Sequence, residues 1–173
     1  GAVHIFSTLR EECPDLKICL CEDTPASGYP KDTVFNALRF GEKLFCKSDS
    51  ISKAVLEYAE KNGLSVVHTN QGYPHCTVLK LNDGAAITAD CGMARVLTEN
   101  GIRVYKIREG HIDLPTRDYG FIGGAAGVFE SSVYFLGAVE KHPDFEIIKE
   151  FIESRGLRCI WTTDMPLTDI GSV

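Results

Sequence analysis

One pattern of elements recurs three times along the chain. Each copy has two apolar runs, then a helical stretch that ends at a glycine, and then a last apolar run. The copies occupy residues 33–70, 76–108 and 127–161. A period of this length marks an array of supersecondary units, each of which buries its apolar face against a neighbour. The repeat therefore predicts an α/β fold that is built from ββαβ units.

Glycine marks the end of the helical stretch in every copy. Gly63, Gly101 and Gly156 each follow an amphipathic run and precede a strand-like one. Glycine adopts the left-handed conformation that closes a helix at almost no steric cost. The predicted helices are 50–61, 92–99 and 144–154. The predicted strands are 34–38, 43–46, 64–67, 76–81, 85–88, 102–105, 127–129, 133–136 and 157–160.

The two ends of the sequence carry parts of the same pattern. Residues 3–12 have a helical period and 16–21 a strand pattern, so the sequence begins halfway through a unit. Residues 170–173 match the opening of another first strand. At about 40 residues a unit there is room for about four units. We therefore expect a single domain, 1–173, truncated at one or both ends; the alternative is a complete α/β domain with ragged ends.

Composition limits the classes of function. The 173 residues are 44% hydrophobic, which suffices for one sizeable core. The net charge of −6 disfavours nucleic acid as a partner, because phosphate binding needs a basic face. No run approaches about 18 consecutive apolar residues, so we expect no membrane span. Seven scattered cysteines without C-x-x-C spacing favour a reducing cytoplasm over a disulfide framework or a zinc site.

Polar and glycine-rich segments interrupt the repeat between residues 70 and 127. Asn-Gln-Gly-Tyr-Pro-His-Cys at 70–76 places two amides, an imidazole and a thiol before a predicted first strand. A long insertion at 110–127 then precedes the third copy. Such insertions on a repeated scaffold are where binding and catalytic sites tend to be built. We therefore expect the functional site here, with a small-molecule ligand and no cofactor or metal.

These residues carry a resemblance to a known superfamily. The ββαβ repeat, the His111-x-Asp113 pair and the Phe-Ile-Gly-Gly turn at 121–124 resemble the pentein fold. That fold is the five-bladed α/β propeller of guanidine-modifying enzymes such as arginine deiminase, dimethylarginine dimethylaminohydrolase and the amidinotransferases. The match is closest to an uncharacterised bacterial branch, through residues 29–32, 70–73, 118–124 and 169–172. The resemblance implies a pentein-like propeller with about four units in this chain. A homodimer is one way to cover the strand edges of such an open ring.

The resemblance implies a chemistry that this sequence matches in part. In those enzymes a cysteine thiolate attacks the guanidinium carbon, a histidine acts as general acid and base, and acidic side chains hold the substrate. His111 and Asp113 match the His-x-Asp element. Ile122 and Ala125 stand where the enzymes' Glu-Gly-Gly-Asp turn has its carboxylates, and that turn usually precedes His-x-Asp. The nucleophile normally lies near the C-terminus, yet no cysteine follows Cys159.

Cys76 is our candidate nucleophile. It lies beside His75 at the head of a predicted strand, and a reactive thiolate needs an adjacent base and some access. The alternative is a packed strand cysteine. We assign His111 and Asp118 as further catalytic residues, although a lone histidine is more often structural. The candidate substrate-binding residues lie at the heads of first strands or in polar segments: Asp32, Asn36, Asn70, Gln71, Tyr73, Asp113, Tyr119 and Asp169.

The sequence leaves two main functions open. One is a hydrolase or amidinotransferase-like enzyme that acts on a C–N bond of a guanidine- or amidine-like small molecule. That function requires a thiol, an imidazole and a carboxylate in one cavity. The other is a catalytically inactive member of the fold that binds a small metabolite or a protein, and the missing carboxylates at 122 and 125 favour it. A ring resembling the penteins that bind ribosomal subunits is a third, weaker option, which the acidic charge does not support.

Overall fold

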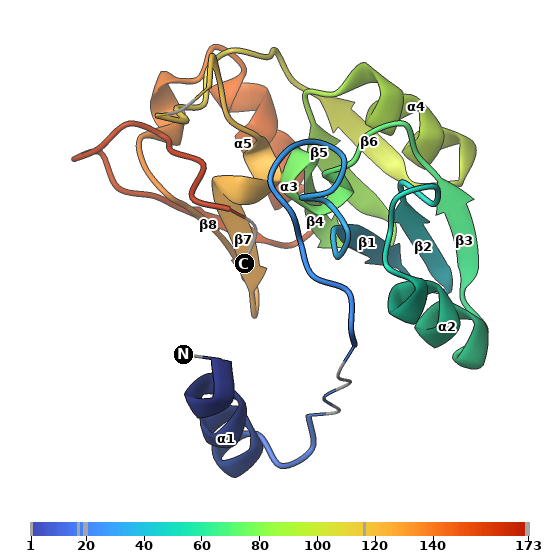
Figure 1. Cartoon of the computed structure of the whole chain (residues 1–173). Coiled ribbons are helices and arrows are strands. Elements are labelled where there is room, and N and C mark those ends of the chain that lie inside the picture. The colour runs from blue at the N-terminus through green and yellow to red at the C-terminus, as the bar shows by residue number, and fades with distance from the viewer. Residues whose placement is uncertain (1, 17, 19–20, 116, 172–173) are drawn as a thin grey trace.

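The computed structural model describes residues 2–16, 18, 21–115 and 117–171, shown in Figure 1. Its elements are, in chain order, α1 (Ala2–Glu12), β1 (Ala37–Phe40), β2 (Lys43–Cys46), α2 (Lys53–Lys61), β3 (Ser65–His68), α3 (Pro74–Thr77), β4 (Val78–Asn82), β5 (Ala85–Thr88), α4 (Cys91–Glu99), β6 (Arg103–Lys106), the short 3₁₀ helix η1 (Ile122–Gly124), β7 (Ala126–Phe129), β8 (Ser132–Phe135), the 3₁₀ helix η2 (Val139–Lys141), α5 (Phe145–Glu153) and β9 (Arg158–Ile160). The predicted strand at 16–21 lies in part outside the described residues, as do residues 172–173 of the last predicted strand.

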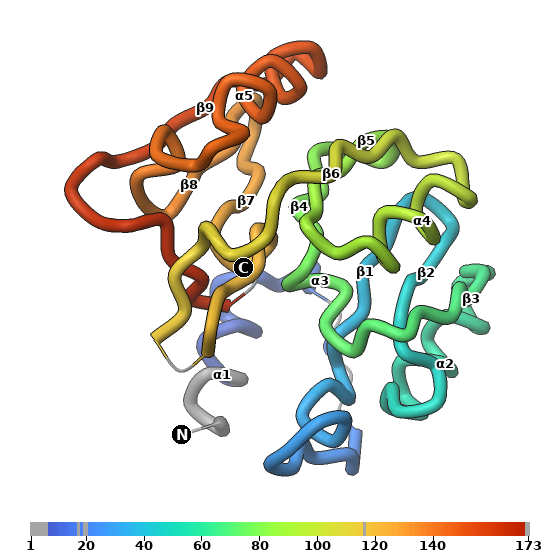
Figure 2. The backbone as a smooth tube through the Cα atoms, turned by 90° about the horizontal axis from the view of Figure 1, so that it is seen from above, coloured from blue at the N-terminus to red at the C-terminus, as the bar shows by residue number. Residues whose placement is uncertain are grey.

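The strands form three separate three-stranded sheets. In each sheet the first two strands pair as an antiparallel hairpin, and the third pairs in parallel with the second after an intervening helix. Three ββαβ units are therefore present in the described residues. Figure 2 shows the sheets side by side in chain order, from β1–β3 at one end to β7–β9 at the other. A fourth unit and a closed propeller are not confirmed.

Local sequence explains where the unit helices begin and end. The hydroxyl of Ser52 accepts a hydrogen bond from the first turn of α2, so this helix begins later than the predicted residue 50. The carboxylate of Asp90 caps α4 in the same way, at 2.7 Å. After the helices, φ is 66° at Gly63, 86° at Gly101 and 76° at Gly156. These left-handed conformations confirm the predicted helix ends.

Two predicted first strands begin later than expected. β1 begins at Ala37 instead of residue 34, and residues 76–77 belong to α3 instead of a strand. Pro74 is the first residue of α3, where its fixed φ suits a helix and its missing N–H leaves no donor unpaired. The side-chain oxygen of Asn36 accepts a hydrogen bond from the N–H of His75 at 2.9 Å. Asn36 and Cys76 therefore lie just before their strands.

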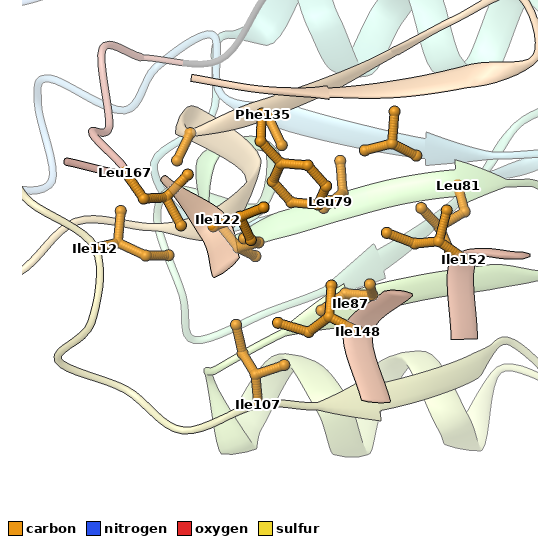
Figure 3. Close-up of a cluster of buried hydrophobic side chains, with 14 of the residues drawn as sticks. Leu79, Leu81, Ile87, Ile107, Ile112, Ile122, Phe135, Ile148, Ile152 and Leu167 are labelled. Carbon is orange, nitrogen blue, oxygen red and sulfur yellow. The ribbon is translucent and has the colours of Figure 1, made fainter. Parts of the chain in front are cut away.

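The units pack face to face through two main apolar clusters. The larger one joins the second sheet, α5 and the third sheet, and ten of its members are labelled in Figure 3: Leu79, Leu81, Ile87, Ile107, Ile112, Ile122, Phe135, Ile148, Ile152 and Leu167. The other joins the first sheet, α4 and the second sheet, through residues that include Phe45, Ala86 and Met93. Each of these helices thus packs against its own sheet and against the sheet before it. Because the helices are packed between successive sheets, the loops that precede the first strands are held in fixed positions.

The first helix confirms the predicted helical pattern at 3–12. α1 lies apart from the three sheets (Figure 1). It is also the longest helix in the described residues, at 11 residues. None of the helices described is long and apolar enough to cross a bilayer.

Candidate functional site

Two of the sequence runs that carry the resemblance, 29–32 and 70–73, are bound to each other. The phenol of Tyr29 donates a hydrogen bond to the carbonyl of Asn70 at 3.2 Å. The phenol of Tyr73 donates one to the carboxylate of Asp32 at 2.7 Å. Gly72 lies against the ring of Tyr29, where a Cβ would come within 2.6 Å of a ring carbon. A side chain at 72 would displace the Tyr29 ring, so glycine allows the two runs to approach this closely.

The other two runs, 118–124 and 169–171, also lie against each other. The carboxylate of Asp169 accepts hydrogen bonds from the N–H groups of Phe121 at 2.8 Å and Gly171 at 2.9 Å. The N–H of Ile170 donates to the carbonyl of Gly124 at 3.0 Å. A Cβ on Gly124 would collide with the Asp169 carboxylate. The glycine and the aspartate thus form one packed unit, and Asp169 is buried.

Gly123 sets the position of the thiol. A Cβ on Gly123 would lie 2.5 to 2.7 Å from the carbonyl oxygens of His75, Cys76 and Val78. Because glycine has no Cβ, η1 rests directly on the backbone of α3. The inserted segment therefore serves as a support for the short helix that carries Cys76.

A cavity of about 720 Å³ lies among these segments, and we call it the thiol cavity. Its lining combines aromatic, charged and thiol side chains with backbone: Tyr29, Tyr73, Cys76, Leu114, Arg117, Asp118, Tyr119, Phe121, Asp169, Ile170 and Gly171. Five of the residues predicted from sequence are among them, namely Tyr73, Cys76, Asp118, Tyr119 and Asp169. The structure thus brings together about half of the predicted site residues.

The thiol of Cys76 has an oriented amide beside it. The side-chain N–H of Asn36 points to Cys76 Sγ, with a nitrogen–sulfur distance of 3.2 Å. The opposite end of this amide accepts the hydrogen bond from the His75 N–H, which fixes its orientation. Asn36 therefore holds the thiol and does not line the cavity.

The other described cysteines are placed less well for nucleophilic chemistry. Burial raises the pKa of the Cys46 thiol in β2. Burial also raises the pKa of Cys159 in β9, to about 11. The exposed thiols of Cys13, Cys21 and Cys91 do not line the thiol cavity. Geometry therefore singles out Cys76.

Tyr73 remains a protonated phenol at neutral pH. Its partial burial and the neighbouring Asp32 carboxylate raise the pKa of Tyr73 to about 12, while Arg117 acts in the opposite direction. The second carboxylate oxygen of Asp32 is buried and has no hydrogen-bond partner among the described residues. Asp32 therefore holds Tyr73 in place and is not part of the cavity lining.

The structure does not bring His111 to the thiol. His111 and Asp113 line a different cavity of about 420 Å³, beside His142, and we call it the imidazole cavity. Asp118 lines both cavities. The reason is a backbone contact, because the N–H of Asp113 donates to the carbonyl of Leu167 at 2.8 Å and holds this segment beside residues 167–169 in an isolated β-bridge. The predicted grouping of thiol, imidazole and carboxylate in one cavity is wrong for the described residues.

The side chain of His75 also faces away from the thiol cavity. It lines a third cavity of about 290 Å³, between the first strands of the three units. Burial lowers the pKa of this imidazole. Adjacency in the sequence therefore did not place a base beside Cys76, because consecutive residues of a helical turn point in different directions.

Asn70 and Gln71 lie in a fourth cavity, of about 450 Å³, at the start of α4. The amide of Gln71 donates a hydrogen bond to the Asp90 carboxylate at 2.9 Å. This cavity and the thiol cavity share three aromatic residues, Tyr29, Tyr73 and Phe121. The predicted binding residues are thus divided between adjacent cavities.

Asp118 is the carboxylate of the thiol cavity that is available to a ligand. It is exposed, and no hydrogen bond to its carboxylate is found within the part of the chain that the structure describes. The carboxylate of Asp169 is already bound to two backbone N–H groups. Arg117 also lines the cavity and was not among the predicted residues, although its position beside Asp118 in the polar insertion could have indicated it. No group of three or more His, Cys, Asp and Glu side chains among the described residues is placed to hold a metal ion.

Comparison with known proteins identifies the fold and the family. The structure is similar to an agmatine deiminase of C. jejuni, with a TM-score of 0.56 at 11% identity, and to a cysteine-to-serine variant of that enzyme with substrate bound, with a TM-score of 0.59 at 11% identity. Each similarity covers 92% of this chain and 56% of the other, so the chain spans little more than half the length of these enzymes. Agmatine deiminases belong to the pentein superfamily, so the similarity bears out the predicted resemblance in fold.

Comparison of the sequence assigns the chain to a family, whereas comparison of the structure shows only its fold. No curated protein matches the chain. A family model with the description "Family of unknown function (DUF6873)" matches residues 3–173. Because this match spans almost the whole chain, the protein belongs to the DUF6873 family.

Proposed function

We propose that this protein acts on a C–N bond of a guanidine- or amidine-like small molecule, with Cys76 as nucleophile in the thiol cavity. The observation that carries the proposal is the Asn36 amide at 3.2 Å from Cys76 Sγ, at a cavity that also presents the Asp118 carboxylate. The likeness to agmatine deiminases supports the substrate class through the fold alone. In this proposal the three ββαβ units belong to a pentein-like propeller.

The lining of the thiol cavity suits a flat cation. Tyr73 and Phe121 lie with ring centroids 6.4 Å apart, and aromatic faces attract cations. Asp118 supplies the counter-charge, which a desolvated cation needs because an unpaired buried charge costs several kcal/mol. Arg117 lines the same cavity and repels a second positive charge. The proposal therefore favours a ligand with one positive charge over a ligand with two.

The proposed reaction has two steps. As the Cys76 sulfur attacks the central carbon and forms a C–S bond, the thiol gives its proton to the Asp118 carboxylate, and the C–N bond to the departing amine breaks as that amine takes up this proton. A water molecule, or an acceptor amine in a transferase, then attacks the same carbon and breaks the C–S bond. Asp118 is the cavity carboxylate that can exchange protons with the leaving and attacking groups.

A non-catalytic binding function is the second candidate. The observation that favours it is that no imidazole lines the thiol cavity among the described residues. Ile122 and Ala125, which replace the acids of the family turn, are both buried in the apolar core. We therefore expect no turnover of free arginine or dimethylarginine. Release of citrulline or ammonia from either compound, abolished by Cys76→Ala, would instead restore arginine-type chemistry.

Thiol labelling tests the proposed site. Chloroacetamidine is a cationic alkylating agent and chloroacetamide is its neutral counterpart, so their ratio of rates at each mapped cysteine measures cation recognition. We expect Cys76 to be labelled with a preference for the amidine, and Asp118→Asn to reduce that preference by on the order of tenfold. Cys91→Ala, which removes an exposed thiol outside the thiol cavity, is the matched control. Faster labelling of Cys91 than of Cys76 by the amidine would overturn the site.

A second measurement separates the enzyme from the binder. A panel of singly charged guanidino and amidino compounds is incubated with the protein, and ammonia release is measured. Release that depends on Cys76 supports the enzyme, whereas protection of Cys76 from labelling without release supports the binder. No disulfide bond joins any of the six described cysteines, which supports a reducing compartment such as the cytoplasm.

A further inference from the structure

The three units present the same sheet face at equivalent positions. The second and third strands of each unit pair in parallel in one common register. This register places an apolar cross-strand pair at the same point of every sheet: Phe45 with Val67, Ile87 with Tyr105, and Tyr134 with Ile160. We call the face that carries these pairs the forward face of each unit.

The forward faces of the first two units are covered by the next unit. Phe45 is 0% exposed and packs in the cluster that contains Met93 of α4. Ile87 is also 0% exposed and packs in the cluster that contains Ile148 of α5. In both cases the covering element is the helix of the following unit together with its sheet. A forward face of this type is therefore built to receive a helix and a sheet.

The forward face of the third unit is bare. Tyr134 is 41% exposed and its partner Ile160 is 39% exposed. Phe129, at the end of β7 on the same face, is 67% exposed. Three apolar side chains on one sheet face form the kind of contiguous exposed patch that marks an interaction site.

At the opposite end of the molecule, the first unit exposes the side of its helix that would pack against such a face. Phe151 stands five residues before the closing glycine of α5, and its ring packs against Tyr105 of the preceding sheet with centroids 5.8 Å apart. Val96 holds the same position in α4 and packs in the cluster with the preceding sheet. Tyr58 holds this position in α2, which has no unit before it among the described residues, and it is 45% exposed. The first unit therefore leaves its sheet-contacting helix side free.

We infer that the bare forward face of the third unit binds the α2 side of the first unit in a second copy of this chain, head to tail. The inference rests on continuity with the two interfaces inside the chain, where a forward face always meets the following helix at this position. A head-to-tail contact uses two different surfaces, and both are present and exposed on each copy. The association is independent of the chemistry proposed for the thiol cavity.

Single substitutions test the two surfaces. The full chain is examined by light scattering over a wide range of concentrations, and we expect a mass above that of one chain. Tyr134→Glu and Tyr58→Glu should each weaken the association by on the order of tenfold or more, because a charge is placed in an apolar contact. Ile147→Glu is the matched control, since Ile147 is an exposed apolar residue of α5 away from both surfaces. Circular dichroism confirms that each variant is folded.

Mixing the two variants tests the geometry. Tyr134→Glu retains an intact α2 side, and Tyr58→Glu retains an intact forward face. An equal mixture should therefore form a one-to-one pair, although neither variant associates alone. A chain that stays monomeric at all concentrations overturns the inference. So does association that Tyr58→Glu leaves unchanged, or a mixture that fails to pair, since two forward faces would then be binding each other.

Discussion

The thiol cavity and the imidazole cavity share Asp118, yet they are built in different ways. At the thiol cavity, α3 rests on η1 backbone to backbone, and Gly123 permits the contact. At the imidazole cavity, His111 is exposed and lies on a segment that is held by the Asp113–Leu167 backbone hydrogen bond. The ring centroids of His111 and His142 are 5.2 Å apart. The comparison shows that packing has fixed the position of the Cys76 thiol, whereas a strand-like bridge between Asp113 and Thr168 has determined where the His111 imidazole lies.

The largest expected effect concerns the contact that supports the thiol. Gly123→Ala should destabilise the fold by about 3 kcal/mol, because the new Cβ would overlap carbonyl oxygens of α3, which cannot move away without distorting the helix. Urea unfolding measures the loss. Gly127→Ala is the control, since a Cβ at Gly127 meets nothing within 4 Å and should cost less than about 1 kcal/mol. Equal losses for the two variants would show that η1 does not hold α3.

The second prediction concerns the Asp169–Gly124 pair beside the thiol cavity. Asp169→Ala should cost about 2 kcal/mol, because it leaves the N–H groups of Phe121 and Gly171 without their acceptor. Gly124→Ala should also destabilise the wild-type protein, since its Cβ would collide with the carboxylate. In the Asp169→Ala background this second cost should fall, because the colliding atoms are gone. Additive costs in a double-mutant cycle would contradict the packed unit.

Sequence patterns predicted the parts of the fold that depend on local chemistry. Gly63, Gly101 and Gly156 closed the helices where expected, and the three ββαβ units that the repeat predicted are present. The candidate site was predicted less well, because its geometry depends on contacts between distant segments. Pro74 began a helical turn at a predicted strand head, and this rotated His75 away from the thiol cavity. The bond from Asp113 to residue 167 joins segments that no local pattern connects.

The third prediction concerns the effect of the Asp32 charge on Tyr73, which lines the thiol cavity. Asp32→Asn should lower the pKa of Tyr73 from about 12 toward its ordinary value near 10, because the neighbouring negative charge is removed. Part of the shift should remain, since burial is its largest cause. Difference ultraviolet absorbance against Tyr73→Phe measures the titration. In the wild type this tyrosine stabilises the fold below pH 10, and that contribution is lost as the pH rises through about 12. An unchanged pKa in Asp32→Asn would show that the hydrogen bond is not formed.

The smallest expected effect tests the imidazole cavity. Burial lowers the pKa of His142, the Asp144 carboxylate and the backbone of Arg108 act against burial, and the charges of His111 and Arg108 act with it. Its Nδ1 accepts a hydrogen bond from the N–H of Asp144 at 3.0 Å, so the neutral ring carries its proton on Nε2, which is buried without a partner among the described residues.

A histidine whose pKa is lowered by folding stabilises the protein above the pKa of the unfolded chain, near 6.5, and this stability is lost as the pH falls through the folded pKa. We therefore expect the free energy of unfolding to decrease below pH 6.5. His142→Asn keeps an acceptor for the Asp144 N–H and removes the titration, so it should flatten this part of the profile. His111→Asn should have a weaker effect, because His111 is exposed. If His111→Asn flattened the profile more than His142→Asn, the exposed imidazole of His111 would be the group whose titration affects stability. The imidazole cavity would then not differ from the thiol cavity in how firmly its titratable group is held by the fold.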